Sequence, residues 1–248
     1  MSDGIYSALS GAVAQQRALD VVANNVANVG TVGYRGDRLA FREAVSRVEG
    51  GPNPDGLRYV SISQMATDDT SGPLTQTGNP LDVALQGDGL FAVRTDDGVR
   101  YTRAGSFRMD PEGVLRTPGG HPLLAADPSD PENPEIRVPR DAGPVQIGAD
   151  GTVSVGDEPL ARIRIERFDD GALQKEGLTL FVPRGDARGE PATETQVLQG
   201  HLEGANVSPI AGMNELITAS RSFEAFQRVI QAFRQIDQRA ARDVGADR

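Results

Sequence analysis

The sequence predicts a mainly β fold with helical termini: an antiparallel β domain flanked by N- and C-terminal α-helices that pair as a coiled-coil-like assembly domain. Three observations lead to this prediction. All sixteen prolines lie between Pro52 and Pro209, so both ends of the chain lack the strongest helix breaker. Apolar residues recur at helical spacing in both ends. The centre is rich in glycine and consists of short apolar runs separated by turn sequences, a pattern typical of antiparallel strands.

The first thirty residues are predicted to form an amphipathic helix. Its stripe takes every third or fourth residue and is apolar at all but one position. Alanines in such a stripe allow a partner helix to approach closely. The stripe consists of Ile5, Leu9, Ala12, Gln16, Leu19, Ala23 and Val26.

Three asparagines, Asn24, Asn25 and Asn28, stand at the end of this helix within five residues. Asparagine tolerates the left-handed backbone conformation and satisfies open backbone groups at helix ends. We therefore expect these side chains to terminate the helix and to fix the turn that follows. The predicted helix-exit motif extends from them through Thr31, Gly33, Tyr34 and Arg35.

The last forty residues carry a second amphipathic pattern. Ser208 followed by Pro209 supplies an N-cap and a proline at the first helical position. Three of the eight phenylalanines fall on the stripe, which favours a buried, paired helix over one that frays. The stripe consists of Leu216, Ala219, Phe223, Phe226, Ile230 and Phe233, and Ile217, Val229 and Ile236 are expected to widen it. The alternative is that both terminal helices are ordinary amphipathic helices packed on the β domain.

Between the helices we expect two further regions. Residues 1–30 and 206–243 form the helical assembly domain, residues 31–80 an extended, loop-rich connector, and residues 81–205 the antiparallel β domain. GGPNPDG at 50–56 is typical of a linker or turn. The Asp- and Pro-rich stretch 125–144 is expected to be an exposed loop. Strands are expected in the segments 81–85, 89–93, 99–109, 113–117, 144–148, 151–155 and 160–168.

The charge distribution follows the same division. The chain of 248 residues has a formal net charge of −10, and the two helical ends together contribute none of it. An acidic surface argues against nucleic acid as a partner, because phosphate binding depends on clustered Lys and Arg. The sequence has neither a typical signal peptide nor an apolar run long enough for membrane insertion, and it has no cysteine.

No catalytic, cofactor-binding or metal-binding residues are predicted, so the sequence indicates a protein that is not an enzyme. Gly87, Gly89 and Ala92 match a dinucleotide-binding pattern, but another strand follows them where that fold requires a helix. The acidic residues considered for catalysis lie in Gly-containing turns, where Asp bonds to its own backbone. They are Asp96, Asp97, Asp110, Glu112, Asp150, Asp169 and Asp170. The two histidines, His121 and His201, are isolated from each other in the sequence.

Three ordered blocks resemble the flagellar rod and hook proteins that build the axial structure of the bacterial flagellum. LDVVANNVANVGTVGYR (19–35) resembles the family's Asn-rich signature. GPLTQTGNPLDVALQGDGLFAVRTDDGVRYTRAGSFRMDPEGVL (72–115) is similar to its central motif, and LEGANVSPIAGMNELITASRSFEAFQRVIQ (202–231) to its last one. The compact length and the run at 221–226 make the chain most like the F-type proximal rod protein.

The resemblance implies a structural subunit whose terminal helices assemble into the axial tube. The implied partners are other copies of itself, neighbouring flagellar rod proteins and the flagellar type III export apparatus. The implied location is the periplasmic rod of the basal body, reached without a cleaved signal peptide. The alternatives are a distal-rod, G-type subunit and, from other classes, an independent β-rich carbohydrate- or peptide-binding module or a wall-cutting enzyme.

Overall fold

The structure is a computed structural model that describes residues 2–46, 57–128, 133–139 and 143–246. The chain forms two compact units. The first, here called the helical unit, comprises residues 1–27, 36–68 and 207–248. The second, the β unit, comprises residues 28–35 and 69–206. The chain therefore passes between the two units four times.

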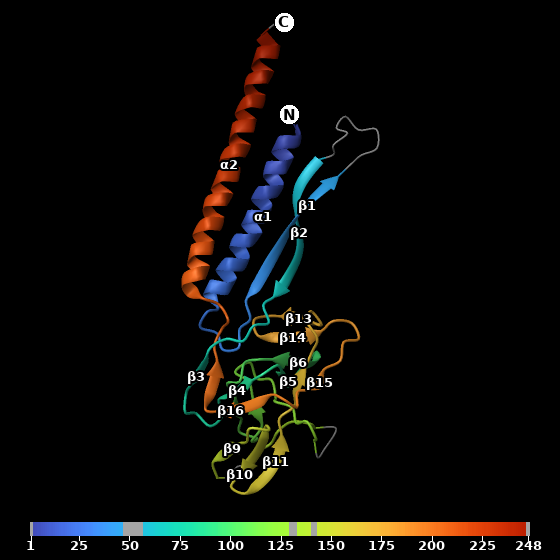
Figure 1. The fold of residues 1–248 in the computed structure, drawn as a ribbon, viewed down its shortest axis with the longest axis vertical. Coiled ribbons are helices and arrows are strands. Elements are labelled where there is room, and N and C mark those ends of the chain that lie inside the picture. Colours follow the sequence, from blue (N-terminus) through green and yellow to red (C-terminus); the bar gives the residue numbers. More distant parts are fainter. Residues whose placement is uncertain (1, 47–56, 129–132, 140–142, 247–248) are drawn as a thin grey trace. The chain divides into compact units, whose positions relative to one another are not determined.

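The helical unit contains two long helices and a hairpin (Figure 1). Helix α1 spans Ser2–Ala27 and helix α2 spans Pro209–Ala246. Strands β1 (Asp37–Ser46) and β2 (Leu57–Thr67) pair antiparallel, with a register shift between Ala40 and Phe41. Helix α1 contacts both α2 and the hairpin. Helix α2 begins as the sequence predicts, because the Ser208 carbonyl accepts from the amide of Gly212 (2.9 Å) and Pro209 takes the first helical position.

The β unit is built from short antiparallel strands in several small sheets. The largest has the order β13-β14-β6-β5-β12-β15, a second has the order β11-β10-β9, and three two-stranded sheets pair β16 with β4, β17 with β3 and β7 with β8. The strands are β3 (Leu74–Gln76), β4 (Val83–Gln86), β5 (Leu90–Thr95), β6 (Gly98–Thr102), β7 (Arg108–Met109), β8 (Leu115–Arg116), β9 (Val145–Ile147), β10 (Thr152–Val155), β11 (Glu158–Arg162), β12 (Ile165–Arg167), β13 (Leu173–Glu176), β14 (Leu180–Pro183), β15 (Glu190–Pro191), β16 (Gln196–Gln199) and β17 (His201–Glu203).

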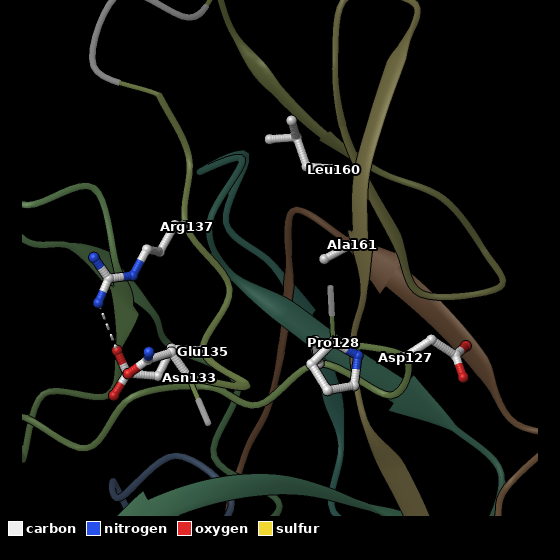
Figure 2. A pocket seen from close by; sticks show the side chains of 8 residues that line it. Asp127, Pro128, Asn133, Glu135, Arg137, Leu160 and Ala161 are labelled. Carbon is white, nitrogen blue, oxygen red and sulfur yellow. Dashed lines mark hydrogen bonds and ion pairs between the residues drawn. The ribbon is translucent and has the colours of Figure 1, made fainter. Parts of the chain in front are cut away.

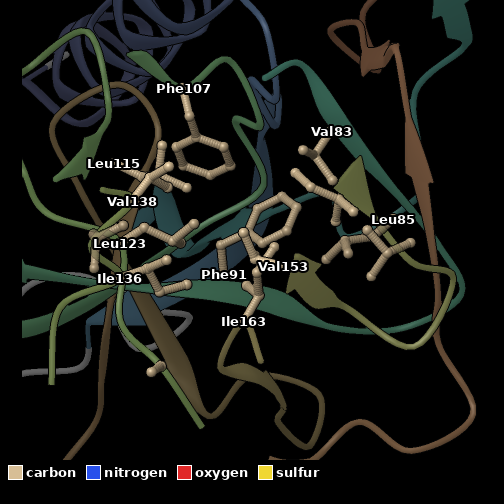
Figure 3. Packing of buried hydrophobic residues seen from close by; sticks show 14 residues of the cluster. Val83, Leu85, Phe91, Phe107, Leu115, Leu123, Ile136, Val138, Val153 and Ile163 are labelled. Atoms are coloured by element: carbon tan, nitrogen blue, oxygen red, sulfur yellow. The ribbon is translucent and has the colours of Figure 1, made fainter. Parts of the chain in front are cut away.

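One main hydrophobic cluster forms the core of the β unit (Figure 3). The Phe91 and Phe107 rings meet edge to face at its centre, with centroids 5.3 Å apart and planes at 87°. Val83, Leu123 and Val153 surround them and are fully buried. Residues from strands that are distant in the sequence thus meet in one core.

The predicted fold class is confirmed, because two terminal helices flank a mainly antiparallel β region. Strands occur in all seven expected segments.

Residues 31–80 differ from the loop-rich connector expected there: much of the stretch is the β1–β2 hairpin, whose alternating apolar residues suit a strand. The expected turn at 50–56 lies outside the described residues. The stretch 125–144 also differs, because Ile136 and Val138 are buried in the core at 0% and 3% exposure.

A second, smaller cluster contains a tyrosine whose titration should affect stability. Burial raises the pKa of the Tyr101 phenol far above its usual value, and the hydrogen bond that it donates to Glu166 Oε2 (2.7 Å) raises it further. The unfolded chain loses this proton near pH 10, whereas the folded chain keeps it. The stabilisation is therefore complete below about pH 10 and is lost as the pH rises through the higher folded pKa.

We expect the urea midpoint to fall between pH 9 and pH 11, and to fall less steeply in Tyr101→Phe. Tyr6→Phe is the matched control, because Tyr6 is 56% exposed. An equally steep fall in Tyr101→Phe and in the control would contradict this assignment.

Candidate functional site

The two terminal helices meet through small residues of α1 and large residues of α2. A Cβ atom at Gly11 would lie 2.5 Å from Cε1 of Phe226, and one at Gly4 would lie 2.8 Å from Cζ of Phe233. Ala8 lies between these glycines on the same face and is 5% exposed. Two phenylalanine rings therefore occupy the space that larger α1 side chains would fill. The sequence signal for this face is small residues at positions 4, 8 and 11, which a search for large apolar residues passes over.

The predicted stripe of α2 is buried or partly buried within the chain, whereas that of α1 is so only in part. Ala12 is buried, and Ile5, Leu19 and Val26 are partly buried. Leu9 is 50% exposed, because the face of α1 that meets α2 is rotated toward the glycines. The predicted α2 residues that are partly buried are Leu216, Phe223, Phe226, Ile230 and Phe233.

Each helix also carries exposed large apolar side chains. On α1, Tyr6, Leu9 and Val13 are 56%, 50% and 48% exposed and lie at the spacing of one helix face. On α2, the residues at that spacing are Ile210, Met213 and Ile217, with 74%, 57% and 50% exposure. We name these six residues the outer stripe. Ile217, Val229 and Ile236 do not widen the buried stripe as expected, since Val229 and Ile236 are also 44% and 49% exposed.

The three asparagines lie at the end of α1 and at the start of the turn that follows. The helix ends at Ala27, one residue before Asn28. In the helical unit, the Asn25 side chain donates to the carbonyl of Asp37 (2.8 Å) and accepts from its amide (3.0 Å), which fixes the start of β1. Asn24 is exposed on the last turn of the helix.

The rest of the exit motif belongs to the β unit. The Asn28 carbonyl accepts from the amide of Thr31 (3.0 Å), and the Thr31 carbonyl accepts from that of Tyr34 (3.2 Å). Gly33 has φ of 65°, and a Cβ there would lie 2.3 Å from the backbone nitrogen of Ala104, so only glycine fits. Tyr34 is fully buried, and the ammonium of Lys175 lies 4.0 Å from the centroid of its ring.

Arg35, the last residue of this motif, joins a buried ionic cluster. Glu203 is 1% exposed and pairs with the guanidinium groups of Arg35 (3.3 Å) and Arg103 (2.5 Å). Arg103 also donates to the carbonyls of Leu85 (2.9 Å), Gly87 (2.8 Å) and Gly89. We name Arg35, Arg103 and Glu203 the polar clasp. Local sequence gave no sign of it, because Arg103 and Glu203 are 100 residues apart.

The polar clasp joins three separate stretches of the chain. Arg35 donates to the carbonyls of Asp69 and Thr70, which follow the β1–β2 hairpin. Glu203 accepts from the amide of Gly72 (2.9 Å). Asn206, three residues before α2, donates its amide to the Tyr34 carbonyl (3.3 Å) and its side chain to that of Thr70 (3.0 Å). The residues next to the terminal helices and the hairpin are thus fixed to one another within the β unit.

The β unit contains an open cavity of about 370 Å³ (Figure 2). Its carboxylates are paired with arginines: Glu135 with Arg137 (3.4 Å) and Arg94 (3.9 Å), and Asp127 with Arg162 (2.9 Å). The cavity is lined by Ala125, Asp127, Pro128, Asn133, Glu135, Arg137, Leu160 and Ala161.

The turn carboxylates have structural roles. Asp110 accepts from the amides of Glu112 (2.9 Å) and Val114 (2.8 Å), and its hydrogen bond with Arg116 holds the pKa of its carboxyl below the usual value. Bonds from the Thr152 hydroxyl and amide lower the pKa of Asp150 in the same way. Across the described ranges, no three His, Asp or Glu side chains are grouped as metal ligands. Neither α1 nor α2, as far as each is described, is both long and apolar enough to cross a membrane.

Three family models match the chain, in the order in which their regions occur in it. Residues 5–35 match the flagella basal body rod protein family. Residues 84–155 match the D1 domain of the flagellar hook protein FlgE/F/G family, and residues 198–243 match the C-terminal region of flagellar basal body rod FlgEFG proteins. The first match contains most of α1 and its exit motif, and the last contains most of α2.

Known proteins similar to the chain align along nearly their full length. The flagellar basal-body rod protein FlgF of Caulobacter vibrioides is 33% identical over 99% of both chains. FlgF of Escherichia coli is 35% identical over 98% of this chain and 97% of its own. FlgG of Bacillus subtilis is 32% identical over 93% and 94%. With helical termini around an antiparallel β region and relatives of this identity and coverage, the chain belongs to the flagellar basal-body rod protein family and is of the F type.

Proposed function

We propose that this protein is a structural subunit of the bacterial flagellar basal-body rod and that it assembles through the outer stripe of its paired helices. The observation that supports this proposal most strongly is the exposure of six large apolar side chains on helices that are already paired. Exposed large apolar side chains that recur along one face of each helix are typical of surfaces that another protein covers. The similar proteins are named flagellar basal-body rod proteins, and this supports the rod as the assembly in which the chain takes part.

The arrangement suits an open-ended assembly. The exposed residues of α1 and those of α2 differ in sequence and in position, so one set on one copy can meet the other set on a neighbour. A contact of this head-to-tail type generates a helical filament when its rotation does not close a ring. We therefore propose other copies and neighbouring rod proteins as the partners, with Ile5, Leu9, Ala12, Leu19, Val26 and the α2 stripe supporting the interface directly or through the helix pair.

We propose further that the chain is not an enzyme, that it lies in the periplasmic rod, and that the flagellar type III apparatus exports it without a cleaved signal peptide. The paired carboxylates of the cavity and turns support a non-catalytic role. Location and export follow from the proposed membership of the rod. A G-type position remains the second candidate, because FlgG of Bacillus subtilis aligns at 32% identity.

Leu9→Asp should remove the protein from the rod without unfolding it. Leu9 is 50% exposed, so its replacement should change the free energy of unfolding of the monomer by no more than about 0.5 kcal/mol. An unpaired carboxylate within an apolar interface should reduce the amount in purified basal bodies at least tenfold, measured by immunoblot in a strain without its own copy.

Gln174→Asp is the control, because it adds the same charge at an exposed position of β13, outside both terminal helices. We expect this variant to enter basal bodies at the normal level. If Leu9→Asp also entered at the normal level, the outer stripe of α1 would not be the interface.

If the unaltered chain were found with distal-rod rather than proximal-rod fractions, the G-type position would replace the F-type one.

A further inference from the structure

We propose that the polar clasp is a pairing device, which makes α1 of each chain pair with its own α2 rather than with the α2 of another copy. This inference concerns the folding of one chain and stands whether or not the chain is a rod subunit. The helices α1 and α2 lie at opposite ends of the sequence. The contacts of Gly4 and Gly11 with Phe233 and Phe226 would be the same whether α2 belonged to the same chain or to another copy.

Exchange of an identical element between copies is a low-cost route to dimers. Whenever two copies fold near each other, α1 of one chain could pair with α2 of the other through the same contacts. Pairing within the chain wins only if the two helices have a high effective concentration for each other. Their attachment points must therefore be held close together.

The polar clasp and its neighbours hold these attachment points. Helix α1 ends at Ala27, and the exit motif reaches Arg35 after eight further residues. Helix α2 begins at Pro209, six residues after Glu203. The Arg35–Glu203 ion pair and the bond from the Asn206 amide to the Tyr34 carbonyl (3.3 Å) join these two segments directly.

The burial of the clasp makes the connection hard to open. The side chains of Arg35, Arg103 and Glu203 are 8%, 2% and 1% exposed, so separating them would leave charges in a site from which water is excluded. Lys175, the only lysine of the chain, holds the first segment from the other side: it lies over the Tyr34 ring and donates to the Arg35 carbonyl (2.6 Å). A fluctuation that freed one helix would have to break these contacts.

The helix pair offers a reporter in a chain that has no cysteine. A Cβ atom at Gly212 would lie 4.0 Å from Cβ of Val26, within the range found in disulfides. Its close contact, at 2.6 Å, is with Cγ2 of Val26, an atom that Val26→Cys removes. A disulfide between positions 26 and 212 therefore reports that α1 and α2 are paired at this point.

The test uses two full-length chains, one with Val26→Cys and one with Gly212→Cys. They are mixed in urea, refolded together, oxidised and separated on a non-reducing gel. A disulfide that joins the two different chains forms only when α1 of one pairs with α2 of the other. With an intact clasp we expect little of this heterodimer, and with Glu203→Gln in both chains we expect several-fold more.

Glu190→Gln is the matched control, because the Glu190 side chain is 74% exposed and pairs only with Arg167 among the ion pairs of the described residues. Equal heterodimer yields in Glu203→Gln and in this control would overturn the proposal. If Glu203→Gln failed to refold by circular dichroism, Lys175→Met would take its place, since it loosens the Tyr34–Arg35 segment and leaves the ionic cluster intact. We then expect about a twofold rise, and no rise above the control would overturn the proposal.

Discussion

Gly11→Val should separate α1 from α2 and lower the free energy of unfolding of the helical unit by about 1–3 kcal/mol, the usual cost of overpacking a close contact. The added Cβ would lie 2.5 Å and 2.6 Å from two atoms of the Phe226 ring, and the two methyl groups of valine need still more space. Valine has a better helix propensity than glycine, but this offsets only a few tenths of a kcal/mol. The steric conflict therefore decides the sign.

Urea unfolding followed by circular dichroism at 222 nm measures this change. Ala23→Val is the matched control, because Ala23 is exposed on the same helix, and it should shift the curve by less than about 0.5 kcal/mol. Adding Phe226→Ala to Gly11→Val should recover part of the loss, since it removes the ring that the valine displaces. A loss in Gly11→Val no greater than in Ala23→Val would mean that the two helices do not meet at Gly11.

Arg103→Met should destabilise the β unit by about 3–5 kcal/mol, the effect of removing one partner of a buried ion pair. Glu203 would lose one of its two guanidinium partners at 1% exposure. The carbonyls of Leu85, Gly87 and Gly89 would lose their donor at the same time. Methionine has a similar length to arginine, so the loss would come from charge and hydrogen bonding more than from a cavity.

The near-ultraviolet circular dichroism of the buried Tyr34 and Tyr101 gives an unfolding signal from the β unit itself. Arg167→Met is the matched control: it removes an ion pair whose side chains are 55% and 74% exposed, and such pairs contribute about 0–1 kcal/mol. We expect its unfolding curve to be close to that of the unaltered chain. Equal effects of the two substitutions would show that the polar clasp contributes no more than a surface pair.

The sequence predicted those features that depend on neighbouring residues. The start of α2 followed from Ser208 and Pro209, and its buried stripe followed from the spacing of Phe223, Phe226 and Phe233. Strands were found where short apolar runs alternate with Gly-containing turns. In each case the chain within a few residues carries the signal, as helix caps, helical periodicity and turns require.

Features that depend on distant contacts were missed. The predicted α1 stripe runs through Leu9, which is half exposed, whereas the contact with α2 uses Gly4 and Gly11, which have no side chain. Ile136 and Val138 lie in a Pro-rich stretch that resembles a surface loop, yet strands from elsewhere bury them. Arg103 and Glu203 resemble solvated charges until the fold brings them together.

The Gly and Ala face of α1 has a consequence for the isolated protein. In most soluble proteins a helix turns its large apolar residues inward, whereas α1 places small ones against its partner and leaves Tyr6, Leu9 and Val13 in water. The first half of α1 thus exposes three large apolar residues while its small residues face α2. The purified subunit should consequently stay monomeric only in dilute solution. As its concentration rises, light scattering should show association while circular dichroism still shows the folded state.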